Sequence, residues 1–221
     1  MMRMINDIVY TIGYSGFQLE EFLKTLKTHH ISAVIDVRSS PHSRYYSEYN
    51  AEPLKVILNK NEIAYRSYSR EFGARQADSI FSPKGYMDFN LFVKSSQFLE
   101  GVRKIERGIE EGYTPAFMCA EKRPVNCHRA ILVTRWFFEH GYQVIHILPD
   151  GKTETQEDIE NQLKEIYFPG RAQISLFNSD KNESDFVFDA YIKANEKIGY
   201  RETTEKMTEQ DDKESMVYEA I

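Results

Sequence analysis

The chain has 221 residues, 41% of them hydrophobic and 28% charged, which supplies enough apolar sequence for a buried core and excludes a wholly disordered protein. Its 28 lysines and arginines against 34 aspartates and glutamates give a net charge of −6, which excludes a generally basic nucleic-acid-binding protein. Because the chain has only two cysteines and no apolar run typical of a signal peptide or a membrane span, we expect a cytoplasmic protein with reduced thiols and no membrane contact.

Short apolar, β-branched segments alternate along the chain with segments whose apolar residues recur at helical spacing. The first pattern predicts buried strands, and the second predicts helices. In chain order, the predicted strands are residues 8–13, 32–38, 63–68, 114–119 and 144–148. The predicted helices are residues 17–30, 54–58, 86–111, 129–140 and 157–168, the third of them weakened or broken at Gly101 or Gly108.

This alternation predicts an α/β fold with three layers, in which a mainly parallel sheet carries helices on both faces, as in Rossmann-like proteins. The strands are apolar throughout, as expected for a sheet covered on both sides, and their order in the sheet does not follow from the sequence. We assign residues 1–170 to this domain, residues 171–200 to a C-terminal extension, and residues 201–221 to an acidic tail that we expect to be mobile.

Polar and basic side chains follow the predicted strands at the ends where parallel sheets bind ligands. The tail 201–221 holds three basic and seven acidic residues, so it accounts for most of the net charge of −6 and leaves segments 66–75 and 119–129 locally basic. A single basic loop is often only a solvated surface, but several at the same end of a sheet predict a site for a phosphate, a nucleotide or a nucleic-acid strand. The predicted binding residues are Tyr14, Ser15, Arg38, Arg44 and Arg129.

Both cysteines lie in one short segment between the end of a predicted strand and the start of a predicted helix. At a helix N-terminus beside His128 and Arg129, Cys127 is expected to have a lowered pKa and to act as a nucleophile. Glu121 is then its acid–base partner, and Cys119 fits a small buried hydrophobic residue. Cys119, Cys127 and His128 could also bind zinc, but their spacing matches no common zinc motif, so no metal is predicted.

Three motifs stand in order along the chain: Thr11–Ser15, then Asp36–Arg38 with Pro41, Ser43 and Arg44, then Met118–Glu121 with Pro124 and Cys127–Arg129. Together with the segment 144–151, they resemble the DUF488 family over residues 8–170. The resemblance implies a compact α/β domain, in agreement with the pattern of strands and helices. The family name records that its function is not established, so the resemblance supplies candidate residues and no reaction. These candidates are Tyr14, Asp36, Arg38, Arg44, Glu121, Cys127, His128 and Arg129.

A five-residue motif, Gln173–Phe177, follows the predicted domain. It resembles the peptide by which bacterial replication and repair proteins bind the sliding clamp, with Ile174 in place of the usual leucine. Leu176 and Phe177 would enter an apolar groove while Gln173 forms hydrogen bonds beside it. The motif predicts docking on a bacterial sliding clamp, and the alternative is that the segment packs back on its own domain.

These features together predict an enzyme that acts on a nucleic acid or another phosphate-bearing anionic substrate, in DNA maintenance. The predicted catalytic residues are Glu121, Cys127, His128 and Asp36. Two alternatives stay open. The first is a non-catalytic module that binds an anion or a nucleic acid through the same residues, and the second is a thiol-redox or metal-binding protein that uses Cys119 and Cys127.

Overall fold

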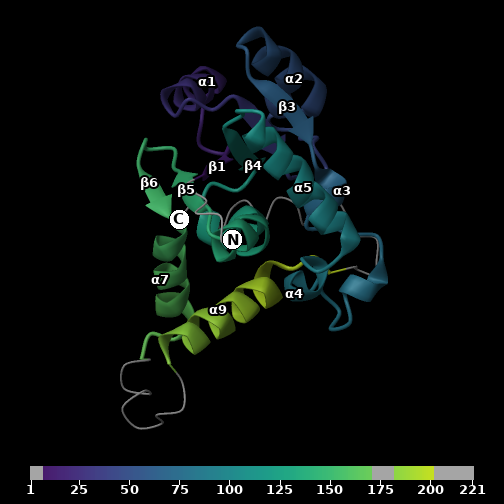
Figure 1. Cartoon of the computed structure of the whole chain (residues 1–221), viewed down its shortest axis with the longest axis vertical. Helices are drawn as coiled ribbons and strands as arrows, with labels where there is room; N and C mark the ends of the chain where they lie inside the picture. The colour runs from purple at the N-terminus through teal and green to yellow at the C-terminus, as the bar shows by residue number, and fades with distance from the viewer. Residues whose placement is uncertain (1–6, 171–181, 202–221) are drawn as a thin grey trace.

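A computed structural model describes residues 7–170 and 182–201 of the chain (Figure 1). Its strands are β1 (Ile8–Gly13), β2 (Ala33–Asp36), β3 (Ala64–Ser67), β4 (Pro115–Cys119), β5 (Gln143–Ile147) and β6 (Thr153–Thr155). They form one sheet in the order β3-β2-β4-β1-β5-β6, in which neighbouring strands are parallel except for β6, which is antiparallel to β5. The five predicted strands and the mainly parallel sheet are confirmed, and the short edge strand β6 is added to them.

Helices connect the strands and follow the last of them. The longer ones are α1 (Leu19–Thr28), α2 (Ala51–Lys60), α5 (Ser96–Glu110), α6 (Arg135–Glu139), α7 (Gln156–Tyr167) and α9 (Glu183–Ile198). Shorter helical segments in the connections are η1 (Ser47–Tyr49), α3 (Ser69–Phe72), η2 (Ser79–Phe81), α4 (Phe89–Phe92), η3 (Pro124–Asn126) and the π-helical η4 (Arg129–Thr134). Within the part of the chain that the structure describes, no helix combines the length and the apolar composition needed to cross a membrane.

Two of the predicted helices are divided in the structure. The third forms α4 and α5, and the break falls at Ser95, whose hydroxyl accepts a hydrogen bond from the N–H of Phe98 and caps α5. The predicted weak point at Gly101 or Gly108 is wrong, since both residues lie inside α5. A Cβ atom on Gly101 would lie 2.8 Å from the ring of Phe72, so glycine is needed there for close packing. The next predicted helix begins as η4 and continues as α6.

Helices cover both faces of the sheet, as predicted, because the side chains of each strand alternate between two apolar cores. One core packs Phe22 of α1 and Leu54 of α2 against strand residues that include Met118. The other core gathers side chains of α5, α6, α7 and α9 around Phe117 on the opposite face. Phe117 and Met118 are adjacent in β4 and belong to different cores, which is the three-layer arrangement expected from the apolar strands.

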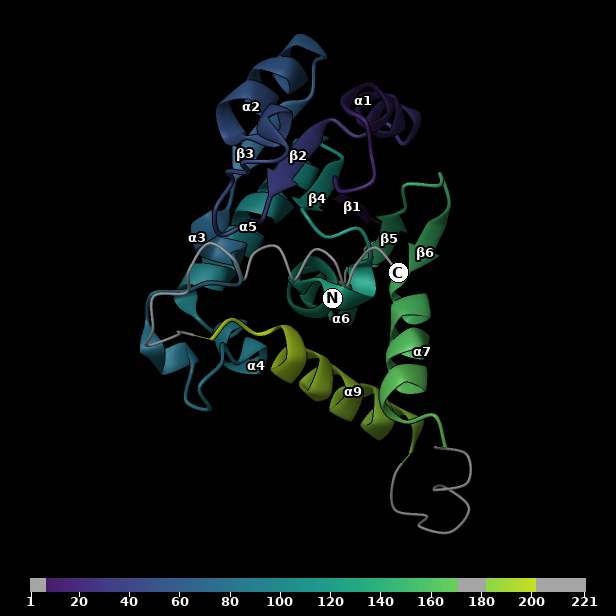
Figure 2. The same ribbon diagram turned by 180° about the vertical axis from the view of Figure 1, so that it is seen from behind.

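The C-terminal extension contributes helix α9 to the second core. This helix packs along α7, and Figure 2 shows it crossing the molecule below α6, from α7 toward α4. Tyr191 is buried in this contact, and the side chain of Asn195 bonds the backbone of Met87 and Phe89 at 2.8 and 2.9 Å. The Gln173–Phe177 motif and the acidic tail after residue 201 lie outside the described residues.

The carboxyl ends of β1, β2 and β4 lie at the point in the sheet where the connections between strands change from one face to the other. The connections after β1 and β2 pass through α1 and α2 on one face, whereas those after β3 and β4 pass through α5 and α6 on the other. Open α/β sheets bind their ligands at such a point, where loops leave neighbouring strands toward opposite faces. The loops after these three strands carry most of the predicted site residues, among them Tyr14, Arg38 and Glu121.

Candidate metal centre

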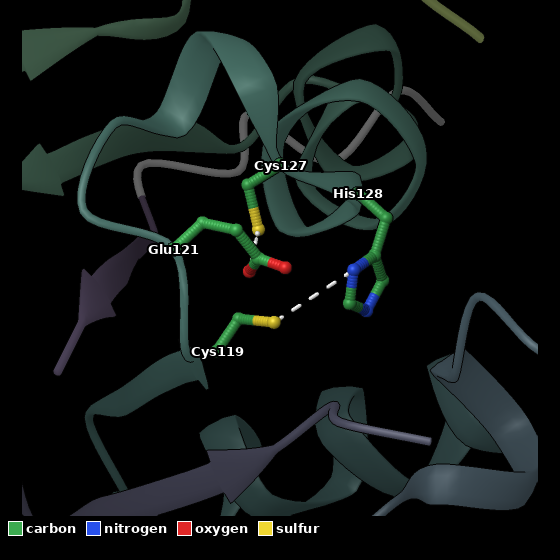
Figure 3. A group of neighbouring side chains, drawn as sticks. All are labelled: Cys119, Glu121, Cys127 and His128. Atoms are coloured by element: carbon green, nitrogen blue, oxygen red, sulfur yellow. Dashed lines mark hydrogen bonds between the residues drawn. The ribbon is translucent and has the colours of Figure 1, made fainter. Parts of the chain in front are cut away.

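Four side chains with metal-ligating atoms meet beyond the carboxyl end of β4 (Figure 3). This cluster consists of Cys119, Glu121, Cys127 and His128, and its ligand atoms all lie within 4.8 Å of one another. The thiol of Cys127 donates to Oε2 of Glu121 at 2.9 Å, and Sγ of Cys119 lies 3.7 Å from Nδ1 of His128. Both thiols are free, and only 2% of Cys119 and 1% of Cys127 is exposed.

A backbone carbonyl fixes the orientation of the His128 imidazole. Nε2 of His128 lies 2.9 Å from the carbonyl oxygen of Val37, which can only accept, so Nε2 carries the proton of this bond. Nδ1 then faces the two cysteines and Glu121 (Figure 3). Metal-binding histidines have the same arrangement, in which one ring nitrogen binds the ion and the other donates to a carbonyl or a carboxylate.

Burial and mutual contact shift the pKa values of the two thiols and the imidazole. Burial has the largest effect on Cys119, whose pKa is raised well above its ordinary value. At Cys127 burial also raises the pKa, but contact with Cys119 and the charge of Arg129 outweigh it and lower the pKa to about 6. At His128 burial lowers the pKa, and the neighbouring Cys127 and Glu121 outweigh it and raise the pKa to about 9. A metal ion bound at Nδ1 would displace the proton from that nitrogen and leave the proton on Nε2 that bonds Val37.

Arg129 holds the loop between the two cysteines in place. Its guanidinium donates to the carbonyl oxygens of Glu121 and Lys122 at 2.6 and 3.2 Å. Its backbone N–H lies 3.4 Å from Sγ of Cys127 and donates to it. The side chain of Arg129 is fully buried, so these contacts serve to position the cluster. This placement does not support the predicted role of Arg129 in binding a substrate anion.

Gly13, the last residue of β1, lets the same loop approach the sheet. A Cβ atom on Gly13 would lie 1.8 Å from the carbonyl oxygen of Glu121 and 3.1 Å from Nη1 of Arg129. Only glycine fits this contact. The next two N–H groups, those of Tyr14 and Ser15, donate at 3.0 Å to carbonyl oxygens at and after the end of β4. Tyr14 and Ser15 therefore join the ends of two strands through their backbone.

Asp36 and Arg38 form a buried ion pair at the end of β2. Nε and Nη2 of Arg38 both donate to the Asp36 carboxylate, which also accepts from the hydroxyl of Tyr65 at 2.7 Å. Nη2 donates further to the carbonyl oxygen of Tyr49, whereas Nη1 is buried with no hydrogen-bond partner among the described residues. The guanidinium carbon lies 5.1 Å from the ring centre of Tyr14. Asp36 thus anchors Arg38 at the end of β2.

The other predicted site residues differ in their placement. Tyr14 is buried, and its pKa is raised by that burial against the opposing charge of Arg38. Arg44 is exposed in the loop after β2. Gln173, Leu176 and Phe177 belong to the segment outside the described residues.

Glu121 completes a ligand set of which the sequence indicates three members. Cys119, Cys127 and His128 could bind zinc, but their spacing along the chain matches no common motif, so the sequence alone predicts no metal. The structure brings the Glu121 carboxylate to the same point, since it follows the strand that ends at Cys119. Val37, which orients His128, could not be found from the sequence because the contact is made by a backbone atom.

Comparison with known proteins assigns the chain to a family of unknown function. Residues 18–136 match the model of the family described as "Domain of unknown function DUF488". No curated protein and no solved structure matches the chain. The matched residues contain all four members of the cluster, whereas β1, β5, α7 and α9 lie outside them.

Proposed function

The chain belongs to the DUF488 family, whose description names no activity, and we propose that its site binds a divalent transition-metal ion within the cluster of Figure 3. The observation that carries this proposal is the convergence of two thiols, an imidazole nitrogen and a carboxylate within 4.8 Å. Zn²⁺ takes such ligands in tetrahedral sites. Mg²⁺ and Ca²⁺ prefer oxygen ligands, so two thiols argue against both. Zn²⁺ is therefore the first ion to test.

Burial favours a metal ion over nucleophilic catalysis as the use of Cys127. Only 1% of Cys127 is exposed, and its thiol is bonded to Glu121. Reactive cysteines are at least partly accessible, whereas a buried sulfur is out of reach of a nucleic acid or another large substrate. The roles predicted for Glu121, Cys127 and His128 in acid–base and nucleophilic chemistry become those of metal ligands in this proposal.

Glu121 is the least buried of the four ligands and the one that a water molecule or a substrate would replace. Two cysteines and one histidine with an exchangeable fourth position form a known type of catalytic zinc site, whereas four fixed ligands form a structural one. The predicted enzyme acting on a phosphate-bearing substrate requires the exchangeable arrangement. The bound ion would supply a Lewis acid for such a reaction.

Metal content and metal affinity test the proposal directly. We expect protein purified without chelator to contain one transition-metal ion per chain, as measured by inductively coupled plasma mass spectrometry. Cys119→Ser and Cys127→Ser should each lower the affinity for Zn²⁺ by about 100-fold or more, measured by competition with a chromophoric chelator. This loss is larger than the about 10- to 100-fold expected when a residue that only orients a ligand is replaced. His42→Ala changes an exposed histidine outside the cluster and should bind like the wild type. Reduced wild-type protein that binds neither Zn²⁺ nor Co²⁺ would overturn the proposal.

The second candidate function is a redox-active dithiol of Cys119 and Cys127. In its favour, both thiols are free, and their sulfur atoms lie within 4.8 Å of each other. Closing the disulfide requires an S–S distance of about 2.0 Å and transfers two electrons and two protons to an external oxidant. Alkylation without reductant followed by mass spectrometry separates the candidates, because a disulfide blocks both sulfurs and survives the removal of metal by a chelator.

We propose a bacterial sliding clamp as a partner, and the Gln173–Phe177 motif is the only basis for this proposal. Surface plasmon resonance with a peptide of residues 171–179 and a purified clamp tests this partner. Binding should be lost on Leu176→Ala and on Phe177→Ala, whose side chains would fill the apolar groove. A wild-type peptide that does not bind would contradict this partner and leave the metal proposal unaffected.

A further inference from the structure

A continuous series of buried hydrogen bonds runs from the cluster to helix α9. Nε of Arg129 lies 3.3 Å from Oγ1 of Thr11, which lies 2.8 Å from Nδ1 of His146. Nε2 of His146 lies 3.0 Å from Oε1 of Gln156, whose Nε2 lies 2.9 Å from the hydroxyl of Tyr191. All five side chains are buried. We refer to these five residues as the buried relay.

Donors and acceptors in the buried relay have one consistent assignment. The guanidinium of Arg129 can only donate, so Thr11 accepts from it and gives its own hydroxyl proton to Nδ1 of His146. The imidazole of His146 then carries its proton on Nε2 and donates it to Gln156, whose amide group donates to Tyr191. Burial, and after it the charge of Arg129, lowers the pKa of His146 to about 3, which keeps this imidazole neutral. A change in one member therefore disturbs its neighbours on both sides.

The near end of the buried relay touches two of the proposed metal ligands. The guanidinium of Arg129 donates to the backbone of Glu121, and its N–H donates to the sulfur of Cys127. The same guanidinium donates from Nε to the hydroxyl of Thr11 in β1. The position of Thr11 thus fixes Arg129, and Arg129 fixes the two ligands.

We propose that Thr11, His146 and Gln156 are positioning residues of the metal centre, acting through Arg129, and that the centre extends in this way to Tyr191 of α9. This inference rests on the proposed metal function. Outer-shell partners that orient metal ligands change metal affinity by about 10- to 100-fold when they are lost. Thr11, His146, Gln156 and Tyr191 all lie outside the residues 18–136 that match the family model, so this support comes from the rest of the chain.

Thr11→Val tests the proposal because valine keeps the shape of threonine and removes the hydroxyl. The affinity of the full chain for Zn²⁺ should fall about ten-fold. The visible spectrum of the Co²⁺-substituted protein should also change, because its bands report the geometry of the ligands. Thr11→Ser keeps the hydroxyl and should restore both properties. Ile159→Val, which removes one methyl group from the same core outside the buried relay, should change neither.

Tyr191→Phe repeats the test from the far end of the buried relay and serves if Thr11→Val does not fold. We expect its Zn²⁺ affinity to fall by about three-fold or more. This loss is smaller than the loss expected for a residue that contacts a metal ligand directly, because Tyr191 lies at the far end of the buried relay. Variants that bind Zn²⁺ as tightly as the wild type, with the same Co²⁺ spectrum, would overturn the positioning role and leave the metal function standing. A wild-type protein that binds no metal would overturn both.

Discussion

The imidazole of His128 donates from Nε2 to the carbonyl oxygen of Val37 at 2.9 Å, although 91 residues separate the two in the sequence. Val37 follows β2 and is joined to β4, because its own N–H donates to the carbonyl oxygen of Met118 at 3.0 Å. The bond from His128 therefore forms only when β2 and β4 pair in the correct register. The pairing of the sheet thus orients Nδ1 of His128 toward the cluster, as the proposed metal site requires.

His128→Ala should lower the affinity for Zn²⁺ by about 100-fold or more, because it removes a ligand together with its bond to Val37. Free imidazole can occupy the volume of the lost ring, so its addition should restore part of the Co²⁺ spectrum. Chelator competition and visible spectroscopy measure the two effects. His140→Ala removes an exposed histidine and is the control. An affinity unchanged in His128→Ala would exclude this imidazole as a ligand.

Gly13→Ala should disrupt the cluster without altering any of its members. The new Cβ atom would lie 1.8 Å from the carbonyl oxygen of Glu121, so the loop after β4 must move. Overpacking of this kind costs about 1–3 kcal/mol in the free energy of unfolding, and here it should also weaken Zn²⁺ binding. Gly108→Ala is the matched control, since its Cβ atom meets nothing within 4 Å, and it should stabilise α5 by about 0.5–1 kcal/mol. Normal Zn²⁺ affinity in Gly13→Ala would contradict this account of the loop.

The sequence was sufficient to predict most of the parallel sheet, because β1, β2, β4 and β5 lie in apolar runs that indicate buried strands. The edge strand β3 was predicted as well, although only Tyr65 of its four residues is buried. The sequence did not predict β6, which is polar and partly exposed and exists through its pairing with β5. The break before α5 was also misplaced, because the capping hydroxyl of Ser95 decides it and the expected glycines do not.

The candidate site was predictable in its residues and less so in their roles. Cys119, Cys127 and His128 were singled out by their positions at a strand end and a helix start. The burial of Arg129 depends on Thr11 and on two carbonyl groups, contacts that only the folded chain creates. A basic residue at the start of a helix suggests an anion site by local rules, and the contacts of its guanidinium with two carbonyl oxygens appear only in the folded chain.

Asp36→Asn should destabilise the protein strongly, because it leaves the charge of Arg38 buried without its partner. The two side chains are 0% and 5% exposed, and breaking such a pair costs about 3–5 kcal/mol. Urea denaturation measures this loss. Glu183→Gln breaks the pair of Glu183 with Lys164, in which the carboxylate is 68% exposed, and should cost less than about 1 kcal/mol. Equal losses in the two variants would show that the buried pair contributes little to stability.

His146 should make the stability of the protein depend on pH in the acidic range. Burial, followed by the charge of Arg129, lowers the pKa of this imidazole to about 3, against the opposing effects of its hydrogen bond with Gln156 and of the charge of Asp158. An unfolded chain has a histidine pKa of about 6.5. Between these two values the unfolded state binds a proton that the folded state does not. As pH falls through this window, the free energy of unfolding therefore decreases by about 1.4 kcal/mol per pH unit on account of His146.

His146→Gln removes this titration and keeps an uncharged polar side chain beside Thr11 and Gln156. At pH 7.5 the variant should be less stable than the wild type, because glutamine cannot reproduce both bonds of the imidazole. As pH falls from 6 to 4, the difference should narrow, since only the wild type loses stability through the protonation of His146 in its unfolded state. Urea denaturation of the metal-free proteins at pH 7.5, 6, 5 and 4 measures both trends. A stability difference that stays constant over this range would show that His146 titrates alike in the folded and unfolded states and is not held neutral by the buried relay.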